Sequence, residues 1–136
     1  MSFRYHIESN SHIVRIVGTD QGSLESAKET FAHVINDPQL LRPLGLLIDV
    51  RALNNIPSSE ESEGLSKFAK IGDNVQHFTA LLVNQGIQYG IARMIQLFSE
   101  LRGAQINVFV DEQAAQYWLW EQLAFAAKSR STDADQ

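Results

Sequence analysis

The stretch Gly45-Leu46-Leu47-Ile48-Asp49-Val50 carries the strongest indication of the fold class. It is an apolar run interrupted only by Asp49, and such a run is typical of a strand that is covered on both faces. The stretch Phe78-Thr79-Ala80-Leu81-Leu82-Val83 has the same character. Because strands of this kind occur mainly in parallel sheets flanked by helices, the two stretches predict an α/β protein.

Amphipathic segments surround these two strands. The spacing of apolar residues predicts helices over 24–35, 59–71, 87–102 and from 112 to about 127. Ser23 and Asp111 are expected to cap the first and the last helix, and Ser58 with Glu61 forms a capping-box pattern before the second. Gly103 is the expected residue just beyond the end of the third helix.

The N-terminal residues predict a β-hairpin, because residues 3–8 alternate apolar with polar side chains and residues 12–18 are rich in β-branched ones. A last strand is expected over 106–110. The predicted order is β-β-α-β-α-β-α-β-α. This order indicates a mostly parallel, five-stranded sheet with an antiparallel N-terminal edge strand, covered by about four helices.

For two of the predicted helices, the sequence indicates which side chains are buried and which face outward. The predicted buried stripe of the third helix consists of Ile87, Ile91, Met94, Ile95, Phe98 and Leu101. In the last helix, a buried centre on Ala115, Leu119 and Gln122 places Tyr117 and Trp120 on the opposite side. Large aromatic side chains on an outward face are typical of interfaces, so Tyr117 and Trp120 predict a surface for self-association or for a partner protein.

Composition narrows the class of protein. The chain has 136 residues, of which 44% are hydrophobic and 20% are charged, as in an ordinary globular domain. We expect one domain over residues 1–127 and a disordered tail over 128–136. The absence of cysteine excludes disulfides and thiolate zinc sites. The net charge of -5 argues against nucleic-acid binding, which needs a basic surface.

The sequence also bears on location and on metal binding. Residues 1–6 lack the apolar run of a signal peptide, and no stretch reaches the roughly 18 apolar residues of a membrane span. We therefore expect a cytoplasmic protein without stable membrane insertion. The histidines have no metal-ligand spacing, and acids at the start of a helix are explained by its dipole, so neither a metal nor a cofactor is expected. The histidines are His6, His12, His33 and His77, and the acids at the start of the second helix are Glu60, Glu61 and Glu63.

Several stretches resemble a known family. They are Leu47-Ile48-Asp49-Val50-Arg51-Ala52-Leu53, Asn36-Asp37-Pro38, Tyr89-Gly90-Ile91-Ala92-Arg93-Met94 and 111–119. With the order of elements, they resemble the STAS, or SpoIIAA-like, superfamily, and in particular a bacterial SpoIIAA-like branch that shares a fold with the CRAL-TRIO lipid-binding domains. The resemblance covers about residues 3–125 and concerns mainly the pattern of strands and helices.

This resemblance implies a non-catalytic binding or regulatory module, in the form of a homodimer. The relation to lipid-binding proteins implies a small apolar or amphipathic ligand in a groove between the sheet edge and the helices Ser59–Ile71 and Ile87–Arg102. A regulatory protein partner is the other possibility that the resemblance leaves open.

In the anti-sigma factor antagonist branch of the family, a partner kinase phosphorylates a serine within an Asp-Ser-Ser-Gly motif. Ser58 and Ser59 match the two serines, whereas Pro57 and Glu60 replace the aspartate and the glycine. The kinase would therefore meet a different loop with added negative charge. Capping of the second helix by itself explains these residue types.

Polar residues follow the predicted covered strands, where ligands gather in open α/β sheets. The predicted ligand-binding set is Asp49, Arg51, Asn84, Tyr89, Arg93 and Asp111. Alternatively, the two aspartates cap backbone amides and the two arginines make surface ion pairs.

Three functions stay open from the sequence. They are a non-catalytic module, a phosphoswitch with Ser58 or Ser59 as acceptor, and a small enzyme that uses Asp49, Arg51 and Arg93. No nucleotide-binding or acyl-transfer motif is present in the chain. The enzyme would need a carboxyl group with a strongly perturbed pKa in a pocket.

Overall fold

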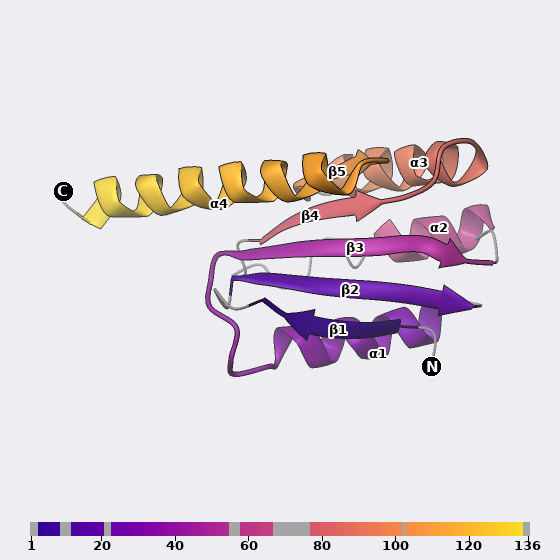
Figure 1. Ribbon diagram of the computed structural model, residues 1–136, viewed down its shortest axis with the longest axis horizontal. Coiled ribbons are helices and arrows are strands. Elements are labelled where there is room, and N and C mark those ends of the chain that lie inside the picture. The colour runs from indigo at the N-terminus through magenta and orange to yellow at the C-terminus, as the bar shows by residue number, and fades with distance from the viewer. Residues whose placement is uncertain are drawn as a thin grey trace.

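The computed structural model describes residues 3–8, 12–20, 23–54, 58–66, 77–101 and 103–134 (Figure 1). Within these ranges the chain forms five strands and four helices in the predicted order. The strands are β1 (Phe3–Ile7), β2 (Ile13–Asp20), β3 (Leu44–Leu53), β4 (His77–Leu82) and β5 (Ile106–Phe109). The helices are α1 (Leu24–Ile35), α2 (Ser59–Ser66), α3 (Ile87–Leu101) and α4 (Glu112–Ala134).

The strands of the described residues form one sheet in the order β1-β2-β3-β4-β5. β1 pairs antiparallel with β2, and all later pairs are parallel. The predicted α/β class, the mostly parallel sheet and the antiparallel edge strand are therefore confirmed. In the parallel part, Val17, Asp49 and Leu82 lie side by side on neighbouring strands, so the carboxyl ends of β2, β3 and β4 meet at one edge.

The two faces of the sheet bury different cores. Leu46 and Ile48 of β3 belong to a core that includes Ala92 of α3 and Val34 of α1. Leu47, between them, belongs to a second core that is completed by α4. Because side chains alternate along a strand, α1 and α3 lie on one face and α4 lies on the other. Figure 1 shows α4 running beside β4 and continuing past the end of the sheet.

The helix ends follow the predicted local chemistry. The Ser23 hydroxyl accepts a hydrogen bond from the backbone of Ser26, and the Asp111 carboxylate accepts one from that of Ala114. Ser58 and Glu61 form the reciprocal capping box, with distances of 3.1 and 3.2 Å.

The end of α3 is a Schellman motif around Gly103. Gly103 has a φ of 85°, which favours glycine, and its N–H donates to the carbonyl of Glu100. The N–H of Ala104 donates to the carbonyl of Ser99, which completes the motif. The prediction that Gly103 follows the end of the third helix is therefore confirmed.

The predicted buried stripe of α3 is wrong at both ends. Ile87 is 66% exposed and Leu101 is 85% exposed, whereas the buried side consists of Ala92, Gln96 and Ser99. The most apolar side of α3 is therefore not its most buried side, and the spacing of its apolar residues did not determine which side faces the sheet. The small side chains of Ala92 and Ser99 allow α3 to lie close to its neighbours.

The last helix extends beyond its predicted end at about Ala127 and reaches Ala134. The continuation over residues 128–134 contains neither glycine nor proline, but two serines, a threonine and an aspartate make up most of it, and these residues favour helix only weakly. The end predicted for the second helix, at 72–74, lies outside the described residues. Across the described parts of the chain, no helix combines the length and the apolar character that spanning a membrane requires.

Candidate functional site

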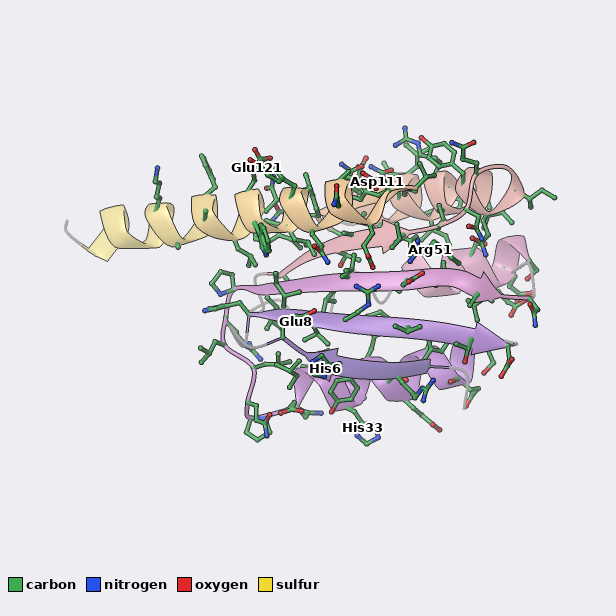
Figure 2. The ribbon with its side chains drawn as sticks, viewed as in Figure 1. His6, Glu8, His33, Arg51, Asp111 and Glu121 are labelled. Atoms are coloured by element: carbon green, nitrogen blue, oxygen red, sulfur yellow. The ribbon has the colours of Figure 1, made fainter. Side chains whose placement is uncertain are left out.

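A cluster of charged side chains lies near the carboxyl end of β3, and its central member is Asp49. The carboxylate of Asp49 is largely buried, with 8% of the residue exposed. The Arg51 guanidinium binds it in a bidentate manner, with Nε at 3.0 Å from Oδ1 and Nη2 at 2.9 Å from Oδ2. The backbone N–H of Arg51 also donates to Oδ1. Figure 2 shows Arg51 on this part of the sheet, with Asp111 of the α4 cap nearby.

Arg15 of β2 and Glu112 of α4 complete the cluster. Arg15 Nη2 lies 3.5 Å from the Asp49 carboxylate and also donates to the carboxylate of Glu112. Glu112 is within 3.8 Å of Arg51 as well. Two guanidinium groups therefore meet two carboxylates, and the cluster is electrically balanced. It joins β2, β3 and the first turn of α4.

The surroundings of Asp49 act on its pKa in opposite directions. Burial raises the pKa of the carboxyl group. Hydrogen bonds from the side chain and the backbone of Arg51, together with the charges of Arg51 and Arg15, lower it more strongly. The net result is a pKa below the ordinary value, so Asp49 is ionised at neutral pH. The hydrogen bond to Asp49 in turn raises the pKa of Arg51.

Asn84 and Gln88 secure the same end of β3 through its backbone. Asn84 Nδ2 donates to the carbonyl of Arg51, and Gln88 Nε2 donates to the carbonyl of Val50, each over 2.9 Å. The amide oxygen of Gln88 accepts from the backbone N–H of Asn84 at 2.8 Å. These bonds pair carbonyl groups near the end of the β3 ladder and tie the start of α3 to the sheet.

Tyr89 and Arg93 lie on α3, which packs against the opposite face of the sheet from the charged cluster. Arg93 Nη1 donates to Gln96 Oε1 at 2.6 Å. Gln96 Nε2 donates in turn to the Glu100 carboxylate at 2.9 Å and to the carbonyl of Ile106 at 3.2 Å. Arg93 thus belongs to a separate polar network.

The predicted ligand-binding set is therefore divided between two places. Asp49 and Arg51 contact each other, Asn84 holds the backbone beside them, and Asp111 caps α4 next to Glu112. The alternative interpretation describes Asp49, Asp111 and Arg51 well, because these residues cap amides or form an ion pair.

The sequence interpretation missed Arg15, Glu112 and Gln88. Arg15 is a single charge within the apolar strand Ile13–Val17, and that isolated charge is the one signal that pointed to a partner nearby. Glu112 is explained equally well by the dipole of α4, and Gln88 is an unremarkable residue in the first turn of a helix. Their roles depend on contacts between distant elements.

The chemistry of the cluster suits a structural role, in which it links β2, β3 and the start of α4. Its carboxylates are paired with arginines, and the lowered pKa of Asp49 keeps that group from donating a proton near neutral pH. Within the described ranges, no group of three or more histidine, aspartate or glutamate side chains is placed to hold a metal ion.

The outward side of α4 exposes large aromatic residues. Tyr117 is 66% exposed and Trp120 is 55% exposed, as predicted. Phe125, which the sequence interpretation did not single out, is 72% exposed. Trp118, in contrast, packs edge-on against Phe78 with ring centres 6.5 Å apart. One side of α4 is therefore fixed on the sheet while its other sides present aromatic rings.

Ser58 lies exposed before the first turn of α2. Its hydroxyl accepts from the backbone N–H of Glu61, so the capping role is present in the structure. The side chain of Ser59 and the whole of Pro57 lie outside the described parts of the chain.

A scan against protein-family models gives no match, and a search of curated proteins gives no significant match either. The structure shows an α/β fold with a mostly parallel sheet over the described residues. The resemblance to the SpoIIAA-like group stays an interpretation of the residues.

Proposed function

We propose that the protein is a non-catalytic regulatory module of the SpoIIAA-like type, which binds a partner protein through the outward side of α4. One observation carries this proposal: Tyr117, Trp120 and Phe125 are each more than half exposed on a helix whose opposite side is buried. Aromatic side chains of this kind supply much of the binding energy in protein interfaces.

The spacing of the outward residues supports a helix-in-groove mode of binding. Tyr117, Trp120 and Ala124 occupy positions i, i+3 and i+7, and all of them are exposed. These are the positions at which a helix places its anchors into a groove on a partner. The small side chain of Ala124 allows the wall of such a groove to approach the helix backbone.

The charged cluster supports the same function by fixing α4 at its start. Glu112 is tied to Arg15 and Arg51, so the first turn of α4 is anchored to the sheet. Figure 1 shows α4 running along β4 and its C-terminal part continuing past the end of the sheet, so the side of α4 that faces away from the strands is open to a partner. Glu121 is exposed among the aromatic residues, so a groove with a basic rim is the expected complement.

The proposal is tested by quantitative capture from a lysate of the native host, followed by binding of the purified partner. Trp120→Ala and Phe125→Ala are expected to weaken binding of that partner by about tenfold or more, as truncation of an aromatic anchor does. Gln113→Ala is the matched control, because Gln113 is an exposed residue of the same helix. A partner that binds all of these variants as tightly as the unchanged protein would refute the proposal.

The small apolar or amphipathic ligand is the other form of the binding proposal. It is tested by comparing the mass of the purified protein under native and denaturing conditions. An additional mass of roughly a few hundred daltons in the native state would indicate a bound small molecule and would shift the proposal to that ligand. A native mass that equals the sum of the chains would support the protein partner.

A phosphoswitch at Ser58 or Ser59 is the second candidate function, and the exposure of Ser58 at the start of α2 favours it. The helix dipole stabilises a phosphate at this position, but the nearby Glu61 carboxylate repels one. Intact-mass measurement on protein from its native host should then show an added mass of about 80 Da, one phosphoryl group. The addition should disappear in Ser58→Ala or Ser59→Ala, and its absence under several growth conditions would remove this candidate.

A further inference from the structure

An apolar stripe runs along the solvent side of α3. Ile87, Leu97 and Leu101 are each more than half exposed. Gly90 and Met94 complete the stripe, so that its members follow one another at intervals of three and four residues. This is the spacing with which one helix packs along another.

The opposite side of α3 is already occupied. Ala92, Gln96 and Ser99 are buried there, and the helix packs against β5 and α2. α3 therefore leaves an apolar stripe exposed although its other side is already packed. A continuous apolar surface that faces solvent marks an interaction site.

We propose that α3 packs antiparallel against α3 of a second copy of the chain, about a twofold axis, and that the protein is a homodimer through this contact. The sizes of the side chains in the stripe are complementary in such a pair. With Leu97 of one chain beside the partner's Met94, Leu101 of the first chain lies over the partner's Gly90. Nothing lies within 4 Å of the position that a Cβ would take on Gly90, so the space for the leucine is open.

The charges on α3 determine the direction of the pairing. Arg93 and Glu100 are the charged residues of this helix, and they lie two turns apart on the same flank of the stripe. In the antiparallel register, Arg93 faces the partner's Glu100, and Glu100 faces the partner's Arg93. A parallel pair would instead set the two Arg93 side chains at one level and the two Glu100 side chains at another.

Gln96 orders the side chains of Arg93 and Glu100 before the contact forms. Its amide accepts from Arg93 and donates to Glu100, so it holds the two side chains on one flank within each chain. The partner's carboxylate and guanidinium would then meet side chains whose freedom is already reduced. This self-complementarity identifies a second copy as the occupant, since the same surface supplies both members of each pair.

The contact is modest in size. α3 has 15 residues and is therefore about 22 Å long, so a pair of such helices buries less than the roughly 800 Å² per chain of a standard interface. We expect a reversible dimer that dissociates on dilution through the micromolar range, and more readily at high salt.

Sedimentation velocity over a dilution series tests the proposal. The unchanged protein is expected to shift from dimer to monomer as it is diluted. Leu97→Glu is expected to raise the dissociation constant by about tenfold or more, because it places a charge in the middle of the apolar stripe. Leu97 is exposed in the single chain, so this change is compatible with folding, which far-ultraviolet circular dichroism verifies.

Charge exchange provides the sharper test. Arg93→Glu leaves α3 with acidic side chains only, and Glu100→Arg leaves it with basic side chains only, so each variant is expected to associate poorly with itself. An equimolar mixture of the two variants is expected to recover the dimer, because each supplies the charges that the other lacks. Failure of the mixture to associate would overturn the proposed register.

A control separates this contact from the surface on α4. Trp120→Ala is expected to leave the dimer intact, and Leu97→Glu is expected to leave capture of a protein partner intact. A dimer that survives Leu97→Glu but is lost in Trp120→Ala would refute pairing through α3. An unchanged protein that stays monomeric throughout the dilution series would refute it as well, without bearing on the function of α4.

Discussion

α3 and α4 cover opposite faces of one sheet, and they distribute their side chains in opposite ways. α4 turns Ala115 and Leu119 fully inward and exposes polar and aromatic residues. α3 turns Gln96 and Ser99 inward and exposes Leu101. The contrast shows that a helix in this protein is arranged by every surface that contacts it, and that the sheet is one such surface among others.

The two helices are also fixed to the sheet by different chemistry. α4 relies on apolar packing along its length and on the ion pairs of Glu112 at its start. α3 relies on the amides of Gln88 and Gln96, which donate to carbonyl groups of β3 and β5. Apolar burial contributes more free energy per side chain than a net hydrogen bond does, so substitutions on α4 should have the larger effects.

The largest effect is expected for Leu119→Ala. Leu119 is completely buried between α4 and the sheet, and truncation of such a side chain loses transfer free energy and leaves a cavity. We expect the free energy of unfolding to fall by about 2–5 kcal/mol, measured by urea denaturation. A loss no greater than that of an exposed leucine would show that α4 contributes little to the core.

Asp49→Asn should have the next largest effect. Asparagine keeps the size of the side chain but removes the negative charge that Arg15 and Arg51 share. Because Arg15 is partly buried, we expect a loss of about 1–3 kcal/mol in the free energy of unfolding near neutral pH. Urea denaturation of the variant and of the unchanged protein measures the difference.

The same substitution also tests how much Asp49 contributes to the pH dependence of the free energy of unfolding. The pKa of Asp49 is lowered in the folded protein, so its stabilising contribution is present above the unfolded value of about 3.9 and is lost as the pH falls through the folded value. The unchanged protein should therefore lose more stability between about pH 5 and pH 2 than the Asp49→Asn variant does. Equal losses would mean that other carboxyl groups control the acid transition.

Gln96→Met tests the hydrogen bonds that Gln96 makes to Arg93, Glu100 and the carbonyl of Ile106. Methionine has a similar length but cannot bond to the carbonyl of Ile106, to Arg93 or to Glu100. We expect the free energy of unfolding to fall by about 1–2 kcal/mol, because a buried carbonyl loses its hydrogen bond. Gln113→Met on the exposed side of α4 is the control, and an equal change in both variants would remove the special role of Gln96.

Leu97→Ala should have the smallest effect on folding. Its side chain is more than half exposed, so the free energy of unfolding of the monomer should change by about 0.5 kcal/mol or less. Measured below the dissociation range, this value contrasts with that of Leu119→Ala, which is the same chemical change in a buried position. A large loss in the dilute monomer would show that Leu97 packs within its own chain.

The order of the elements and the capping residues could be predicted because both depend on residues that are close in sequence. Ser23, Ser58 with Glu61, Asp111 and Gly103 each act within one turn of a helix. Local rules for capping and for alternation of apolar residues apply there directly. The full length of α4 could not be predicted, because residues 128–134 are polar and most of them favour helix only weakly.

The candidate site could be predicted only in part. Asp49 and Arg51 are two residues apart, and their bidentate pairing lies within one strand. Arg15 and Glu112 are separated by 97 positions, so their contact depends on how α4 crosses the sheet. Tyr89 and Arg93 follow β4 in sequence, yet α3 carries them to the opposite face from Asp49.

Periodicity and short-range hydrogen bonding specify the α/β class, the sheet with its antiparallel edge and the helix caps, so these features could be predicted from the residues alone. Which side of α3 is buried and which distant charges meet around Asp49 depend instead on how the elements pack against one another. The side of α3 that packs against β5 and α2 carries Ala92, Gln96 and Ser99, whereas its most apolar side is largely exposed, so periodicity alone could not identify the buried side. A contact between charges far apart in the chain has no local signal, since its energy exists only once folding brings them together.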